Sequence, residues 1–200
     1  MSTQTSVAPG PILSTALALS VFAAIVSLSG TLLKAPAAMT PFLIWTPILL
    51  SVAAYLRSGR VRSYLLSVPM SWIFIVQAIR APVGIFFLIQ ESRGTLPASL
   101  AATAGWGDLL FGGVSALLLW KPSGSRTVLI LWNTIGLLEI LAVIASAMRL
   151  IVFANDDQGV RSVMTAFPTA LIPLVLVPFV VAAHFLVFAR LNHMTSSIKP

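Results

Sequence analysis

Four ionisable residues stand inside long apolar stretches of the chain: Arg80, Asp108, Glu139 and His184. If those stretches cross a membrane, each charge at mid-depth costs about 2.5–3.5 kcal/mol, so these groups turn toward protein or water and pair with one another. Arginine keeps its charge, and its planar guanidinium suits a carboxylate. We therefore predict a buried ion pair between Arg80 and Asp108. Since one arginine cannot neutralise two carboxylates, Glu139 is a candidate proton carrier.

Residues around these groups recur with the period of an α-helix and form three stripes. The stripes are Gln77, Arg80 and Gly84; Ala101, Gly105, Asp108, Gly112 and Ser115; and Trp132, Gly136, Glu139, Val143 and Ser146, with Asn133 beside the last. Small residues beside a charge let a second helix approach closely. We predict that the stripes converge on one polar intramembrane site composed of Gln77, Arg80, Asp108, Asn133, Glu139 and His184. The alternative is a network that only locks the packing of the helices.

The two histidines give little support to a cofactor. His184 lies near the end of the last apolar run, where we expect interfacial water to reach it, and a hydrogen-bonded packing role is favoured over a ligand role. His193 falls in a polar tail, so a second imidazole for a haem is missing. Cysteine is absent, which excludes disulfides, thiolate metal sites and a catalytic thiol. We expect no catalytic residue, no metal and no cofactor.

The segment Gly105-Trp-Gly-Asp108 matches the GxGD pattern of intramembrane aspartyl proteases. That chemistry needs two carboxylates that share a proton. No earlier apolar run contains an acid, and Glu139 follows in the wrong order. Motifs of soluble enzymes, such as a P-loop or HExxH, are missing too. We expect the two glycines to provide close backbone packing around Asp108, and the sequence favours a protein that is not an enzyme.

The elements that position these residues follow from the composition. Of 200 residues, 58% are hydrophobic and only 8% are charged, and the mean hydropathy is +1.00. A soluble domain carries about 25% charged residues. The chain is therefore predicted to be an all-α, polytopic transmembrane helix bundle with the lipid bilayer as its main partner.

Six apolar runs are each long enough to cross about 30 Å of hydrocarbon. They are 11–33, 38–56, 65–90, 98–120, 127–153 and 164–189. Short connections leave no room for a soluble domain, so we predict one six-helix domain over 1–191 and a disordered polar tail over 192–200. The first run is longer than the core of a signal peptide and no basic residue precedes it, so we expect a retained helix.

Basic residues lie mainly in alternate connections. One side holds Arg57, Arg60, Arg62, Lys121, Arg126, Arg190 and Lys199, and the other holds Lys34, Arg93 and Arg161. The positive-inside rule then places both termini in the cytoplasm of a bacterial inner membrane protein. It also explains the formal charge of +7 without nucleic acid as a partner.

Four motifs together resemble a family of bacterial membrane proteins of this length that has no assigned activity. The motifs are Gln77-x-x-Arg80, Gly105-x-Gly-Asp108, Trp132-Asn-x-x-Gly-Leu137, and Pro173-x4-Pro178 with His184. The resemblance spans the third to the sixth run. It implies a shared six-helix core in which Arg80, Asp108, Asn133 and His184 form one constellation, and it implies no substrate. This chain departs from the family pattern at Glu139, where that pattern is closer to aspartate.

Three functions are consistent with this sequence. The leading hypothesis is a proton-coupled transporter of small solutes, with Glu139 as the proton site and Arg80 as its electrostatic partner. Six helices line only a narrow path, so we expect a homo-oligomer or a partner membrane subunit. The second hypothesis is a non-catalytic accessory or assembly subunit that uses the stripes to hold a partner helix. The third is an intramembrane enzyme acting on lipid or quinone, with Asp108, Glu139 and His184 as acid and base groups.

Overall fold

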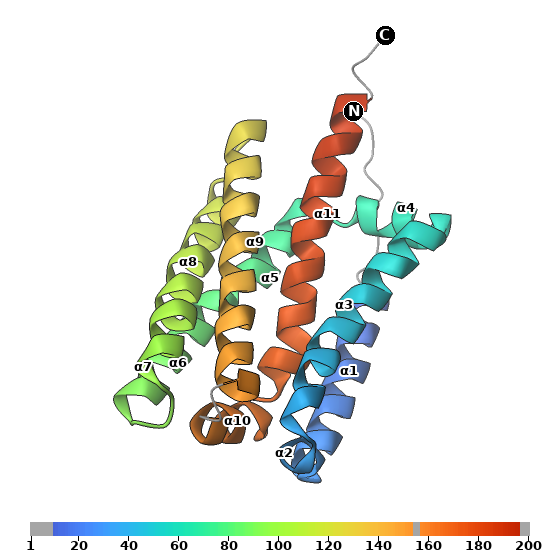
Figure 1. Ribbon diagram of the computed structural model, residues 1–200. Helices are drawn as coiled ribbons and strands as arrows, with labels where there is room; N and C mark the ends of the chain where they lie inside the picture. The colour runs from blue at the N-terminus through green and yellow to red at the C-terminus, as the bar shows by residue number, and fades with distance from the viewer. Residues whose placement is uncertain (1–9, 154–156, 197–200) are drawn as a thin grey trace.

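The computed structural model describes residues 10–153 and 157–196, and every regular element in these residues is helical. Five segments are long and apolar enough to cross a membrane, and a shorter apolar helix accompanies them. Figure 1 shows the long helices side by side as one bundle. The predicted all-α bundle is confirmed: five of the six predicted runs form spans of full length, and the first forms a shorter apolar helix.

Most spans consist of more than one helical element. They are η1 (Ala37–Met39) with α3 (Thr40–Arg57); α5 (Met70–Ala78) with α6 (Arg80–Ser92); α7 (Ala98–Leu100), η2 (Ala101–Trp106) and α8 (Gly107–Trp120); α9 (Arg126–Met148) with η3 (Arg149–Phe153); and η4 (Ile172–Leu176) with α11 (Val177–Ser196). The shorter apolar helix is α1 (Gly10–Leu28). Because α11 continues to Ser196, it passes the boundary expected at 191, and residues 197–200 lie outside the described residues.

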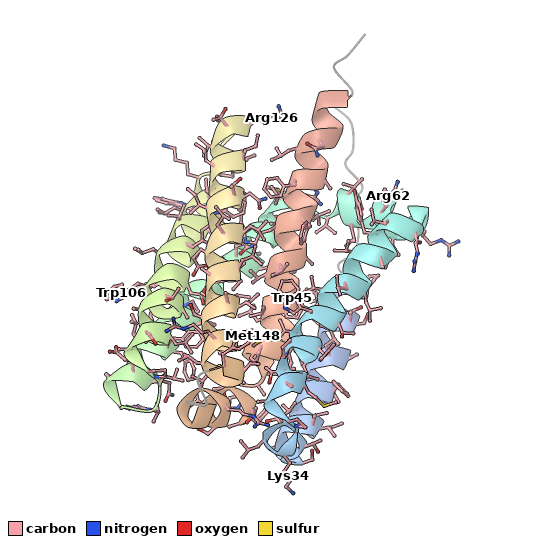
Figure 2. The ribbon with its side chains drawn as sticks, in the orientation of Figure 1. Lys34, Trp45, Arg62, Trp106, Arg126 and Met148 are labelled. Carbon is pink, nitrogen blue, oxygen red and sulfur yellow. The ribbon has the colours of Figure 1, made fainter. Side chains whose placement is uncertain are left out.

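Three short helices lie at the two ends of the bundle. At the lower end in Figure 1 are α2 (Thr31–Lys34) and α10 (Asp157–Thr165), while α4 (Gly59–Ser67) crosses the upper end. Figure 2 places Lys34 at the lower end and both Arg62 and Arg126 at the upper end. We call the upper end the basic end. The separation of charge expected from the sequence is therefore present in the fold.

Three arginines fasten the short helices by donating hydrogen bonds to carbonyls where a helix ends. The acceptors are the carbonyls of Tyr55 and Leu56 for Arg62, of Leu65 and Val68 for Arg190, and of Leu32 and Ala35 for Arg161. The last carbonyls of a helix have no partner inside the helix and carry partial negative charge. A guanidinium at that position satisfies them and also fixes the neighbouring helix.

Breaks within the spans have a local cause. Pro82 has no amide hydrogen for the carbonyl of Ala78, and α5 ends at Ala78 before α6 begins at Arg80. Pro173 lies inside η4, one of three π-helical segments with η2 and η3. Such segments interrupt the regular helical ladder and recur at functional sites.

Two apolar clusters fill the interior, and the polar residues lie where they meet. One cluster contains Phe87, Leu100 and Ile140, and the other contains Phe111 and Trp132. Arg80 lies over the ring of Phe111 from one cluster, and Asp108 lines a cavity together with Phe87, Leu100 and Ile140 from the other.

Candidate functional site

Arg80 is the centre of the site and is 1% exposed. Its Nε donates to Oδ1 of Asp108 at 2.6 Å, and its Nη2 forms an ion pair with Oε2 of Glu139. The predicted pair with Asp108 is therefore confirmed, and Glu139 joins it. We call these three residues the Arg80 centre. Three helices, α6, α8 and α9, each supply one member.

Further contacts hold the guanidinium in place. Nη1 of Arg80 reaches the carbonyl oxygen of Gly136 at 3.5 Å, and the guanidinium carbon lies 4.6 Å from the ring centroid of Phe111. A cation over an aromatic face is attracted by the ring quadrupole, more strongly when water is excluded. Phe111 in turn stacks on Trp132 with the ring centroids 5.5 Å apart. The guanidinium is therefore held by carboxyl groups on one side and by the ring of Phe111 on another.

Asp108 and Glu139 occupy different surroundings. Asp108 is 4% exposed and is the second residue of α8, just after the π-helical segment η2. The side chain of Glu139 is 17% exposed, but its two carboxylate oxygens are buried and Oε1 has no hydrogen-bond partner among the described residues. The exposed part of Glu139 is thus its hydrocarbon stem.

Asn133 and His184 form a reciprocal pair between α9 and α11, and both are fully buried. Nδ2 of Asn133 donates to the backbone carbonyl of His184 at 3.0 Å, and Oδ1 of Asn133 lies 2.9 Å from Nδ1 of His184. With the amide oriented in this way, Nδ1 of a neutral imidazole donates and Nε2 carries a lone pair. Interfacial water was expected at His184, and that expectation is wrong because Asn133 and the ring of Phe111 pack against the imidazole and leave it unexposed.

Gln77 completes the set of predicted residues and is also fully buried. Its Nε2 donates to the carbonyl of Val180 at 3.2 Å, which joins α5 to α11. All six predicted residues therefore lie in the interior formed by α5, α6, α8, α9 and α11. The structure brings Arg80, Asp108 and Glu139 into direct contact, whereas Gln77 and the Asn133–His184 pair bind backbone carbonyls of α11.

Glycines allow the helices that carry these groups to approach one another. A Cβ atom on Gly84 would lie 2.5 Å from the amide nitrogen of Leu109, and one on Gly105 would lie 2.6 Å from a methyl carbon of Leu88. A Cβ on Gly107 would lie 2.9 Å from the carboxyl carbon of Glu139. The glycines of the GxGD segment thus pack against α6 and make room for the carboxylate.

A cavity of about 100 Å³ reaches the Arg80 centre at Asp108. It lies among α3, α9, η3, α10 and η4, and its lining side chains are apolar except for Thr40, Asp108, Arg161 and Thr165. Arg161 belongs to α10, so the cavity extends from Asp108 toward the end opposite the basic end. Of the ionisable members of the site, only Asp108 contributes to its wall.

Phe111 and Arg161 shape the site but were not predicted from the sequence, and Ser115 was predicted only as a member of a stripe, without a partner. The ring of Phe111 lies against the guanidinium of Arg80. Ser115 accepts a hydrogen bond from the indole of Trp132 at 3.1 Å and donates one to the carbonyl of Phe111. Arg161 closes one end of the cavity. The helical spacing from Asp108 placed Ser115 in a stripe. No signal in the sequence indicated that the ring of Phe111 would lie against Arg80.

A cluster of three or more acidic residues or histidines suited to a metal ion does not occur among the described residues. The two carboxylates that meet here are instead joined through a guanidinium. The arrangement can hold charge and a proton.

Comparison with known families matches residues 37–192 to a domain of unknown function, DUF8737. The chain belongs to the DUF8737 family. The DUF8737 match includes every residue of the site and begins after α1 and α2. No curated protein and no solved structure matches the chain.

Proposed function

We propose that this DUF8737 protein is a small proton-coupled carrier of small solutes, with the Arg80 centre as its proton site. The observation that carries the proposal is that two buried carboxylates share one guanidinium. If both were ionised, the centre would hold a net negative charge away from water, which is costly in a low dielectric. A proton on one carboxyl group removes that charge. The centre therefore binds a proton at rest and can release it when its surroundings change.

The cavity supports a carrier in which protons and solute share one route. Asp108 is the member of the Arg80 centre that the cavity reaches, while the carboxylate oxygens of Glu139 are buried and Glu139 does not line the cavity. A change of protonation at either acid alters how strongly Arg80 holds α8 and α9 together. When Arg80 holds α8 and α9 together less strongly, the two helices can separate, and the cavity can widen.

The broken helices support the movement that a carrier needs. The π-helical segment η2 comes directly before Asp108, and η3 and η4 both contribute to the cavity wall. Interrupted helices that line a binding site are a common feature of transporters. Because the α-helical hydrogen-bond pattern is already interrupted in these segments, they can bend without breaking it further.

The proposal includes an orientation and an assembly. The basic end faces the cytoplasm of a bacterial inner membrane, in accordance with the positive-inside rule. The carrier acts as a homo-oligomer or with a partner membrane subunit, because the cavity is smaller than the roughly 300–1,000 Å³ of typical small-molecule sites. Subunits that move against one another would supply the additional volume.

The two other hypotheses fit the geometry less well. An accessory subunit would present its polar stripes to a partner helix, whereas Arg80 pairs with Asp108, and Asn133 pairs with His184, inside the chain. An intramembrane enzyme would need its acid and base groups at one cavity, but Glu139 and His184 do not line the cavity that Asp108 reaches.

The test is proton movement in proteoliposomes that contain a pH-sensitive dye. A panel of small cations, anions and neutral solutes is added, and the internal pH is followed. We expect at least one solute to move protons with the wild-type protein and not with Glu139→Gln. Glu91→Gln is the matched control, since Glu91 is exposed at the end of α6 and loses the same charge. Coupled flux that is unchanged in Glu139→Gln would contradict the proposed proton site.

A further inference from the structure

A second and larger cavity lies away from the Arg80 centre, between α1 and the rest of the bundle. Its volume is about 620 Å³, and its walls come from α1, α3, α4, α5 and α11. Close to the end opposite the basic end, α1 packs against α2 and η4, where Ala23 is fully buried and Ser27 donates to the carbonyl of Thr165. The cavity occupies the space between α1 and its neighbours toward the basic end. We call it the α1 cleft.

The walls of the α1 cleft suit hydrocarbon. Its lining is largely apolar and includes small residues and prolines, among them Pro47, Ala54, Pro178 and Ala183. The hydroxyl groups of Thr15 and Ser51 donate to carbonyls four residues earlier in their own helices, at 2.8 and 2.7 Å. Because these donors are satisfied inside the helices, the cleft offers no polar ligand a strong site along its length.

The mouth of the α1 cleft carries positive charge. Arg60 lines the cleft from α4, the helix that crosses the basic end, and Tyr64 lies one turn further along. Arg60 is exposed, and it has no hydrogen bond or ion pair among the described residues. Arg62, in contrast, donates hydrogen bonds to carbonyls at the end of α3. A cation beside a hydrocarbon slot at the level of an interfacial helix matches a molecule with an anionic head and an apolar tail.

We propose that the α1 cleft binds an anionic phospholipid, with an acyl chain in the cleft and the phosphate at Arg60. Its volume is within the range of about 300–1,000 Å³ found for small-molecule sites. The charge decides the class of occupant, because a second protein helix would not explain a guanidinium at the mouth of an apolar slot. The site is separate from the Arg80 centre, and the proposal does not depend on the function of that centre.

The test is native mass spectrometry of the full chain after purification in a mild detergent, with phosphatidylglycerol or phosphatidylcholine added back. We expect the wild-type protein to retain phosphatidylglycerol in preference to phosphatidylcholine. Arg60→Gln is expected to weaken binding of phosphatidylglycerol about fivefold, the effect of one basic residue at an anionic surface. Arg57→Gln is the matched control, since Arg57 is an exposed arginine near the basic end outside the cleft.

A second variant tests the hydrocarbon slot. Ala54→Trp fills the cleft from α3 and is expected to abolish retention of both lipids, while its melting temperature in detergent shows that the protein is folded. Equal retention of the two lipids by the wild-type protein, or unchanged retention in Ala54→Trp, would overturn the proposal. A dimer mass that is lost in Ala54→Trp, without a lipid adduct, would show that a second copy covers the cleft and would overturn it as well.

Discussion

Replacing Gly112 by alanine tests the close packing that brings Arg80 to Asp108. A Cβ atom on Gly112 would lie 2.9 Å from both Cα and Cβ of Ala81 on α6, and closer still to its amide nitrogen. Unstrained contact begins at 3.4 Å, so these atoms must separate by at least about 0.5 Å (3.4 minus 2.9). Ala81 follows Arg80 directly, and Gly112 lies one turn after Asp108. The separation therefore acts on the ion pair itself.

The neighbouring residue provides the matched control. A Cβ on Gly113 would meet no atom within 4 Å. Both changes gain the same helix propensity, about 1 kcal/mol for alanine over glycine, so their difference isolates the clash. Overpacking costs about 1–3 kcal/mol. We therefore expect Gly112→Ala to be less stable than Gly113→Ala by about 1–3 kcal/mol, with Gly113→Ala as stable as the wild-type protein or more so.

The free energy of unfolding is measured by titrating a mixed micelle with sodium dodecyl sulfate and following tryptophan fluorescence. Trp132 is a suitable reporter because it is 5% exposed and stacks on Phe111. If Gly112→Ala and Gly113→Ala unfold at the same detergent fraction, α6 and α8 do not approach as closely as described. The positioning of Arg80 by that contact would then be wrong.

Two further predictions concern the charges of the site and the orientation of the bundle. Arg80→Met leaves Asp108 and Glu139 buried without their cation, so we expect a loss of about 3–5 kcal/mol in the free energy of unfolding. Adding Asp108→Asn and Glu139→Gln to this variant should restore most of that stability. If stability does not recover, the ion pairs do not hold the helices together. The chain has no cysteine, so Gly124→Cys and Ser92→Cys can each be labelled alone. In intact cells, a membrane-impermeant maleimide should label Ser92→Cys but not Gly124→Cys, and the reverse pattern would invert the proposed orientation.

Much of the fold could be predicted from the sequence, because an apolar run of about twenty residues crosses lipid as a helix, which satisfies its own backbone hydrogen bonds. The positions of Arg80 and Asp108 could be predicted in the same way: each lies at a similar distance from the connection between their two runs, which places them at one depth. Their contact in the structure confirms that reasoning. The glycines of the stripes also lie where the helices pack closely.

The ends of the spans were harder to predict, because arginines that were expected to mark water are bound by protein. Arg190 donates to carbonyls at the end of α4, so α11 continues beyond it and His184 lies deep in the protein. The run expected to begin at 65 instead begins after Pro69, and the residues before it belong to the separate helix α4. A hydropathy pattern places the end of a span at a charged residue, because it does not detect that the charge is bound by another part of the protein.

The partners of the buried amides could not be predicted either. Asn133 and Gln77 bind backbone carbonyls of α11, and a backbone acceptor leaves no signature in the residue types. The contribution of Phe111 depends on the direction of one ring over Arg80. Such contacts depend on how each helix is rotated about its axis. The apolar pattern shows which face of a helix is buried but not the exact rotation.

In the proposed resting state, the Arg80 centre holds one proton between two carboxylates. Infrared spectroscopy of the protein in nanodiscs at neutral pH measures this directly, because a protonated carboxyl group gives a carbonyl band that ionised carboxylates lack. We expect one such band in the wild-type protein and in Glu91→Gln, and its loss or displacement in Glu139→Gln. A wild-type spectrum without a protonated carboxyl band would show that both acids are ionised and would contradict the claim.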